Sequence, residues 1–291
     1  MGHVMKKEEK HITDQDVKQT LPTTRKEVFF DLLKNRKMML FALSCYVFMF
    51  FIPLAIDLLY FNFVESMAIA AEKNEYLFSL IFYSMLIMLP CMMIGFIGLA
   101  GGFYVAKKLV WQDGISLASD FFKGIKENWK HALINGFIFG LVLFGLVVGG
   151  SFLVIYADVH AVVRGIGIGA LIVLFLVFGM VSALNFAQGV YYENSFGVTL
   201  KNSFSFLGLL NWKVFLIYLL STGVVFALSL FNFLTLSIGL LLFAVLNSVV
   251  IVLYTLVSHA AFDKYINQEH YPEYVNKGLY KEEVVLDNKE A

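Results

Sequence analysis

Long apolar stretches separated by short polar segments dominate the pattern of this 291-residue chain. A helix that crosses the hydrocarbon core of a membrane needs about 20 consecutive apolar residues. Four stretches meet this requirement and predict membrane-spanning helices at residues 38–61, 77–105, 132–157 and 166–192. The pattern therefore predicts an all-α, polytopic membrane protein.

The apolar stretch from Val214 to Phe262 is too long for a single span. As one helix it would measure about 74 Å at about 1.5 Å per residue, far more than the hydrocarbon core of roughly 30 Å. Polar side chains gather within residues 231–237, just before Gly239. We expect the chain to fold back there, which gives spans at 214–231 and 238–262 and six spans in all.

Lysine and arginine are distributed unevenly over the predicted loops. Twenty of the 22 basic residues fall on one side of the predicted membrane, and only Lys73 and Arg164 fall on the other. Cytoplasmic loops carry the excess of basic residues in membrane proteins. The asymmetry predicts that both termini are cytoplasmic, with a tail at 1–23, the six-helix domain at 24–262 and a second tail at 263–291. We expect this second tail to be solvated, although it could also dock a partner.

Composition agrees with a membrane protein and excludes other classes. The chain is 59% hydrophobic and 15% charged, whereas soluble domains average roughly 45–50% apolar and about 25% charged residues. Its two cysteines lie inside apolar stretches, which argues against a disulfide scaffold. The 22 basic residues balance the 22 acidic ones, so no net field attracts nucleic acid. The lipid bilayer is the expected partner, and nucleic acid is not.

Two segments on the predicted cytoplasmic face repeat at an offset of 83 residues. Each contains a short Gly-containing start, a phenylalanine and an Asn-Trp-Lys ending, and each precedes a pair of spans. The matching residues are Gly114–Leu117, Phe121 and Asn128–Lys130 in the first segment, and Gly197–Leu200, Phe204 and Asn211–Lys213 in the second. A fainter copy at residues 29–37 precedes the first pair. The chain is thus predicted to contain three elbow-plus-hairpin repeats. In each, a cytoplasmic segment, which we call an elbow, precedes a hairpin of two membrane-spanning helices.

The elbows are expected to be short amphipathic helices that lie in the membrane interface. Thr24 and Glu27 form a capping-box pattern that starts the first of them. The endings Trp129-Lys130 and Trp212-Lys213 are expected to anchor the following spans at the membrane boundary. All three tryptophans, including Trp111, lie on the basic side near predicted boundaries, as aromatic-belt residues do.

Three short motifs resemble those of the YesL-like family of small bacterial membrane proteins. They are Leu89-Pro90, Ala106-Lys107-Lys108 and the stretch 119–130 with its Phe-Phe and Asn-Trp-Lys elements, and the resemblance covers about residues 77–262. The family has no established activity. The resemblance implies a place in the bacterial cytoplasmic membrane and an association with carbohydrate-uptake ABC transporters.

Motifs of catalysis and cofactor binding are missing from the sequence. It contains no phosphate-binding Gly-Lys-Ser/Thr loop, no Cys-x-x-Cys and no His-Glu-x-x-His. We therefore expect no cofactor, no metal and no catalytic residue. Glycines spaced four apart predict close helix packing or self-association, namely Gly98/Gly102, Gly136/Gly140 and Gly145/Gly149.

Intramembrane polar residues are the remaining candidates for a site. One stripe of the fourth predicted span carries Ser182, Asn185, Gln188 and Tyr192. Three further residues lie at similar depth in other spans: Asn135, Thr255 and His259. Asn247 lies alone at mid-membrane. Because lipid offers no hydrogen-bond partners, such groups must face each other or a wet cavity. They either bond helices together, at about 0.6 kcal/mol per pair, or line a polar vestibule open to the cytoplasm.

Three functions are compatible with these patterns. The first is a non-catalytic accessory or scaffold protein that packs against another membrane component, such as a carbohydrate ABC permease. The second is a small-molecule transporter that uses the polar vestibule. The third, a membrane enzyme, needs a nucleophile, base or metal site that the sequence does not display.

Overall fold

The computed structural model describes residues 22–70, 74–155, 158, 160–209, 216 and 232–280, and these contain helices but no strand. The helices are α2 (Arg25–Asn35), α3 (Lys37–Ala70), α4 (Asn74–Val110), α5 (Leu117–Ile155), α6 (Ala161–Tyr191), α7 (Phe196–Leu209), α10 (Phe233–Phe262), the π-helix η2 (Asp263–Asn267), α11 (Gln268–His270) and the 3₁₀ turn η3 (Pro272–Tyr274).

Five of the described helical segments are long and apolar enough to cross a membrane. They are Lys37–Met67, Tyr76–Val110, Leu117–Ile155, Ala161–Tyr191 and Phe233–His270. The predicted all-α class, with several membrane-spanning helices, is confirmed at this level. Apart from residue 216, the predicted span at 214–231 lies outside the described residues, as do Lys73, Trp212 and Lys213.

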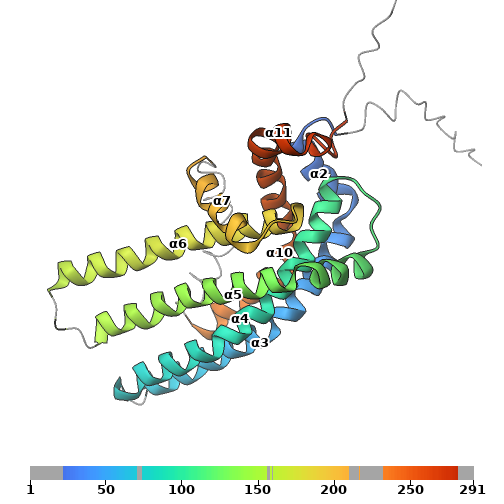
Figure 1. Ribbon diagram of the computed structural model, residues 1–291. Coiled ribbons are helices and arrows are strands. Elements are labelled where there is room, and N and C mark those ends of the chain that lie inside the picture. Colours follow the sequence, from blue (N-terminus) through green and yellow to red (C-terminus); the bar gives the residue numbers. More distant parts are fainter. Residues whose placement is uncertain are drawn as a thin grey trace, which may run out of the picture.

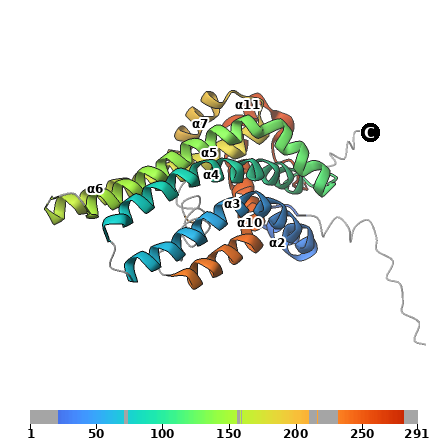
Figure 2. The same cartoon turned by 90° about the horizontal axis from the view of Figure 1, so that it is seen from below.

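The long helices lie side by side (Figure 1), and each of α3, α4 and α5 packs against the next helix in the chain. The basic residues of these helices lie at the same end of the bundle. Lys37 starts α3, Lys107 and Lys108 end α4, and Lys123 lies in the first turns of α5. Arg164 lies at the opposite end, in the first turn of α6. The first half of α10 runs beside α3, and its second half crosses α4 and α6 (Figure 2).

Glycines permit the closest helix contacts in this bundle. A Cβ atom at Gly98 would lie 2.6 Å from Cβ of Phe50 in α3, and one at Gly136 would lie 2.9 Å from Cβ of Phe96 in α4. In lipid, where apolar burial between helices brings little gain, such close packing is a main source of helix association. The outer part of α5 differs, because a Cβ atom at Gly145 would meet open space. Further along α5, a Cβ atom at Gly149 would lie 3.4 Å from Leu171 in α6, so Gly145 and Gly149 do not share one contact as predicted.

The predicted elbow before the first pair of spans is a separate helix, α2, whereas the predicted elbow before the second pair is not separate. Thr24 and Glu27 form the expected capping box at the start of α2, and hydrogen bonds from Thr23 hold the pKa of Glu27 below its ordinary value. Residues 117–130, by contrast, continue without a break into the third span as α5. The physical reason is local: the Asp120 carboxylate accepts from the N–H of Ser116 at 2.8 Å and caps the helix start, and nothing after it interrupts the ladder.

The segment after the last span is folded against the bundle as far as residue 280. Tyr274 lies 5.0 Å from the ring centre of Trp111, and the N–H of Tyr280 donates to the carbonyl of Pro22 at 2.9 Å. Gly278 has φ +85° and leaves no room for a Cβ atom beside the carbonyl of Val110, so this turn needs glycine. The expectation of a solvated tail is thus wrong for residues 263–280, because its tyrosines pack on aromatic side chains of the bundle.

Candidate functional site: a bonded polar cluster and an apolar cavity

The predicted polar residues of the third and fourth spans join α5 to α6. Asn135 Nδ2 donates to the carbonyl of Ser182 at 3.0 Å, and His131 Nε2 lies 3.0 Å from Asn185 Oδ1. Gly189 makes room for the His131 ring, since a Cβ atom there would lie 3.0 Å from it. The side chains of Asn135, His131 and Asn185 and the backbone carbonyl of Ser182 therefore belong to the contact between the two helices.

Gln188 joins α6 to α7 instead. Its Nε2 donates to Ser203 Oγ at 2.9 Å, and the Ser203 hydroxyl donates to the carbonyl of Thr199 at 2.7 Å. Gln188 and Ser203 are fully buried, so the bond is shielded from solvent. This pair holds α7 against α6.

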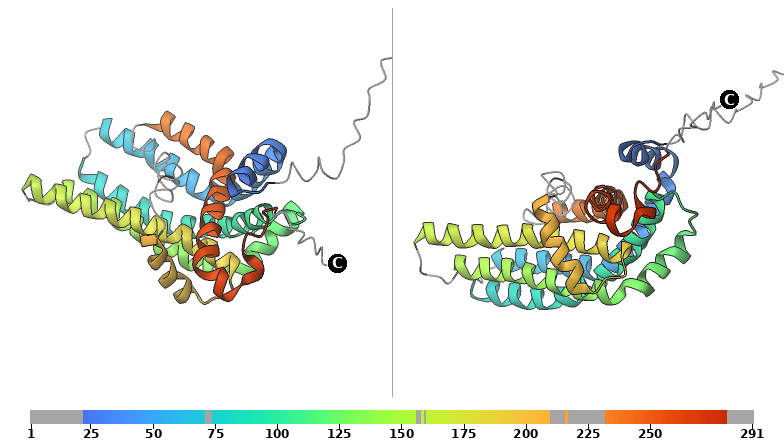
Figure 3. Two further views of the ribbon diagram at one scale, coloured as in Figure 1. Left: turned by 90° about the horizontal axis from the view of Figure 1, so that it is seen from above. Right: turned by 45° about the horizontal axis from the view of Figure 1, so that its top comes forward.

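The N-terminal helix α2 lies beside α10 (Figure 3), and His259 lies in a network that connects α2 to the C-terminal segment. Arg25 pairs with Asp263, and its Nη1 lies 2.8 Å from His259 Nδ1. Because Arg25 has only donors, Nδ1 of His259 must accept, and Nε2 then carries the proton that is donated to the carbonyl of Tyr274 at 3.2 Å. We call Arg25, His259, Asp263, Asn267 and Tyr274 the terminal network.

The remaining bonds of the terminal network satisfy the Asp263 carboxylate. Asn267 Nδ2 donates to Oδ1 at 2.7 Å, and the N–H of Asn276 donates to Oδ2 at 3.0 Å. The Tyr192 hydroxyl donates to Asn267 Oδ1 at 2.6 Å. Burial raises the pKa of Tyr192 above its ordinary value, so the phenol stays protonated as a donor.

The predicted polar residues thus lie in separate contacts rather than around one space. Within the described part of the chain, Thr255 bonds inside its own helix, to the carbonyl of Ile251 at 2.8 Å. Ser182 is the least buried of the predicted polar residues, at 7% exposure. The sequence analysis missed His131, Ser203, Arg25 and Asp263. Only the spacing of Asp263 and Asn267, one turn apart directly after the last span, could have pointed to the terminal network.

The tryptophans divide into an exposed one and a buried one. Trp129 is 43% exposed and lies 5.6 Å from the Lys130 ammonium, as a side chain at the surface of α5. Trp111 is only 8% exposed, because Lys277 lies 3.8 Å from its ring centre and Lys107 lies 4.8 Å from it. The interpretation of Trp111 as an aromatic-belt residue is therefore wrong: the C-terminal segment covers it.

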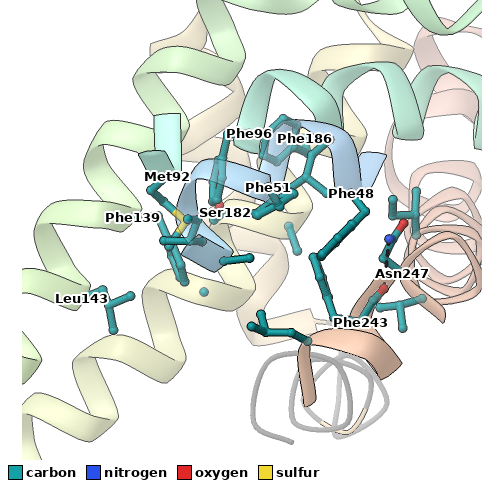
Figure 4. Close-up of a pocket in the computed structure, with 18 of the residues that line it drawn as sticks. Phe48, Phe51, Met92, Phe96, Phe139, Leu143, Ser182, Phe186, Phe243 and Asn247 are labelled. Atoms are coloured by element: carbon teal, nitrogen blue, oxygen red, sulfur yellow. Dashed lines mark hydrogen bonds between the residues drawn. The ribbon is translucent and has the colours of Figure 1, made fainter. Parts of the chain in front are cut away.

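An apolar cavity of about 500 Å³ lies deeper in the bundle, between α3, α4, α5, α6 and α10. Its walls are mainly aromatic and aliphatic side chains, among them Phe51, Met92, Phe96 and Phe186 (Figure 4). Among the described residues that line it there is no aspartate, glutamate, lysine, arginine or histidine. The polar lining residues are Ser182, Asn247 and Tyr254.

Asn247 is held by both neighbouring helices. Its Nδ2 donates to the carbonyl of Ser44 in α3 at 3.1 Å and to the carbonyl of Phe243 in α10 at 3.0 Å. The side chain therefore has partners, although the sequence analysis expected it to be alone at mid-membrane. Next to it, the hydroxyls of Ser44 and Ser248 bond at 2.8 Å.

Among the described residues, no three His, Cys, Asp or Glu side chains gather as metal ligands would. Comparison of the chain with family models, curated proteins and solved structures finds no match in any of the three.

Proposed function

We propose that the protein is a non-catalytic integral membrane protein that serves as an accessory or scaffold component beside another membrane protein. The observation that carries this proposal is the bonding of the candidate polar residues. Four of these side chains form hydrogen bonds between helices or with the C-terminal segment, namely Asn135, Asn185, Gln188 and His259. A vestibule for a polar solute would need these groups to face water.

The exposure of the α5–α6 hairpin supports a scaffold role. Only 17% of the most apolar window of α5 is buried, and 22% of that of α6, against 39% for the other three spans. Leu141 in α5 and Ile172 in α6 are among the exposed apolar side chains, at 43% and 44%. Lipid covers such a face in an isolated protein, and the helices of a partner cover it in a complex. The proposed partner, from the resemblance to YesL-like proteins, is a permease of a carbohydrate ABC transporter.

The proposed topology has six spans, arranged as three elbow-plus-hairpin units, with both termini in the cytoplasm of a bacterium. Its support is the direction of α6 and α10. Tyr191 at the end of α6 packs against His259 and Phe262 at the end of α10, so both helices run toward the end of the bundle that carries α2. Two helices of the same direction require a further crossing between them.

Site-specific crosslinking in intact bacterial membranes tests the scaffold proposal. A photo-crosslinking amino acid is placed at Leu141 or Ile172, with Met49 in α3, which is 60% exposed, as the matched control. We expect crosslinks from α5 and α6 to an ABC permease subunit, and none from Met49.

Crosslinks to lipid alone at all three positions would contradict the scaffold proposal. The transporter alternative is checked with the purified protein in vesicles: uptake of a neutral sugar that Asn185→Leu abolishes would replace the scaffold proposal with transport.

A further inference from the structure

We propose that the cavity binds a neutral lipid that has one hydrocarbon chain and a small hydroxyl head, and that Asn247 accepts the hydrogen bond of that head. This inference goes beyond the scaffold function and does not depend on it. It rests on three features of the cavity: its described lining, the unpartnered acceptor of Asn247 and its position between helices of membrane-spanning length.

The lining selects the body of the ligand. A volume of about 500 Å³ falls within the range of about 300–1,000 Å³ that is typical of small-molecule sites. Apolar side chains, mainly phenylalanines and leucines, form most of the wall, so the occupant presents hydrocarbon to them. A charged head would find no counter-charge among the described lining residues, since none of these carries one.

Asn247 selects the head. Its Nδ2 bonds to two carbonyls, and the opposite orientation of the amide would place Oδ1 against those same oxygens, so Oδ1 is the free acceptor. Among the described residues, this Oδ1 has no hydrogen-bond partner, although Asn247 is only 3% exposed. Buried polar atoms are nearly always paired. A hydroxyl donor on the ligand completes the bonding of Asn247.

The position of the cavity selects the source of the ligand. Its lining residues belong to five helices that are long enough to span a membrane. Molecules dissolved in the bilayer reach such a depth at low free energy, whereas hydrated sugars or ions do not. Long-chain alcohols and monoacylglycerols combine one chain with an uncharged hydroxyl head, and they meet all three requirements.

The test compares two photoactivatable probes on the purified full-length protein in lipid nanodiscs. One probe is hexadecanol with a diazirine in its chain, and the other is its methyl ether, which has the same chain but cannot donate a hydrogen bond. Labelled peptides are identified by mass spectrometry. We expect saturable labelling of cavity peptides, those with Met92 or Phe243 for example, and about tenfold weaker binding of the ether, as one lost hydrogen bond predicts.

Two leucine variants separate the role of Asn247 from a general change in the bundle. Asn247→Leu should abolish the preference for the alcohol over the ether. Asn62→Leu is the matched control, because Asn62 Oδ1 is also buried without a partner but does not line the cavity, and it should keep the preference.

Three outcomes would overturn the proposal. The first is equal labelling by alcohol and ether in the wild type, which decides the matter even where Asn247→Leu fails to fold. The second is labelling that does not saturate or that spreads evenly over lipid-facing peptides. The third is preferential labelling by the corresponding fatty acid at a pH where it is ionised.

Discussion

The terminal network and the cavity lie in the same bundle, yet their polar side chains are arranged differently. In the terminal network both oxygens of Asp263 and both ring nitrogens of His259 have partners. In the cavity wall, Asn247 has two partners for its Nδ2 and none for its Oδ1 among the described residues.

This contrast suggests what each region is for. A fully satisfied buried network stabilises one arrangement, because every departure from it leaves a charge or a donor unpaired. An acceptor that stays unpaired within an apolar wall lowers stability and is kept where a ligand supplies the donor. Stability and binding can therefore be tested at separate residues.

The largest effect is expected from Asp263→Ala, which leaves the Arg25 guanidinium partly buried without its carboxylate. The side chains of Arg25 and Asp263 are 16% and 11% exposed. Breaking such a pair lowers the free energy of unfolding by about 3 kcal/mol. Denaturant titration in detergent micelles measures it, and early proteolysis after residue 262 should accompany the loss.

Lys123→Ala is the matched control for this prediction. Lys123 and Glu127 also form an ion pair, at 3.9 Å, but their side chains are 57% and 49% exposed. Water screens exposed pairs of this kind, so the unfolding transition should hardly change. Similar losses in both variants would show that the terminal network does not hold the two ends of the chain together.

The next largest effect is expected from Gly136→Ala. A Cβ atom there would lie 2.9 Å from Cβ of Phe96 and 3.1 Å from Cα of Met93, so α4 and α5 must move apart. Overpacking of this kind costs about 1–3 kcal/mol. Gly145→Ala is the control, because the same substitution on the same helix meets open space and should leave the unfolding transition unchanged or raise it.

Features of the fold that depend on residues close together in the sequence could be predicted, and features that depend on distant residues could not. The apolar stretches predicted the described spans, because helix length and hydrophobicity are local properties, and the Thr24–Glu27 pattern predicted the start of α2 for the same reason. The continuity of α5 was missed because the pattern of an interfacial helix and that of a long helix with one basic end are alike over residues 117–130.

The candidate site could be predicted only in part, because many of its hydrogen-bond partners are far apart in the sequence. Arg25 and Asp263 are separated by 238 residues, and a lone arginine before the first span carries no sign of a carboxylate after the last one. Depth in the membrane correctly grouped Asn135 with residues of the fourth span, but it could not tell bonded amides from a water-filled vestibule. The cavity was not predictable at all, since phenylalanines on many helix faces are compatible with either a filled or an open core.

A smaller effect is expected from Asn135→Leu. The variant removes the 3.0 Å bond to the carbonyl of Ser182, and interhelical bonds of this kind contribute about 0.6 kcal/mol on average and up to about 1.7. Asn128→Leu is the control, because Asn128 bonds to the carbonyl of Gly124 within its own helix. Equal unfolding free energies for both variants would argue that Asn135 does not help to hold α5 to α6.

The smallest effect on stability is expected from Asn247→Leu. The variant removes the bonds to the carbonyls of Ser44 and Phe243, but both carbonyls lie inside helices, where backbone N–H groups bond to them. The unpartnered Oδ1 is removed together with the amide. The free energy of unfolding should therefore change by less than about 1 kcal/mol. Hexadecanol gives a further test. A ligand that binds only the folded state adds about 2.7 kcal/mol to the free energy of unfolding when its concentration is 100 times its Kd. The alcohol should raise the unfolding midpoint of the wild type and of Asp263→Ala equally and that of Asn247→Leu far less. An equal rise in all three would mean that the alcohol stabilises the bundle as a solvent, without a bond to Asn247.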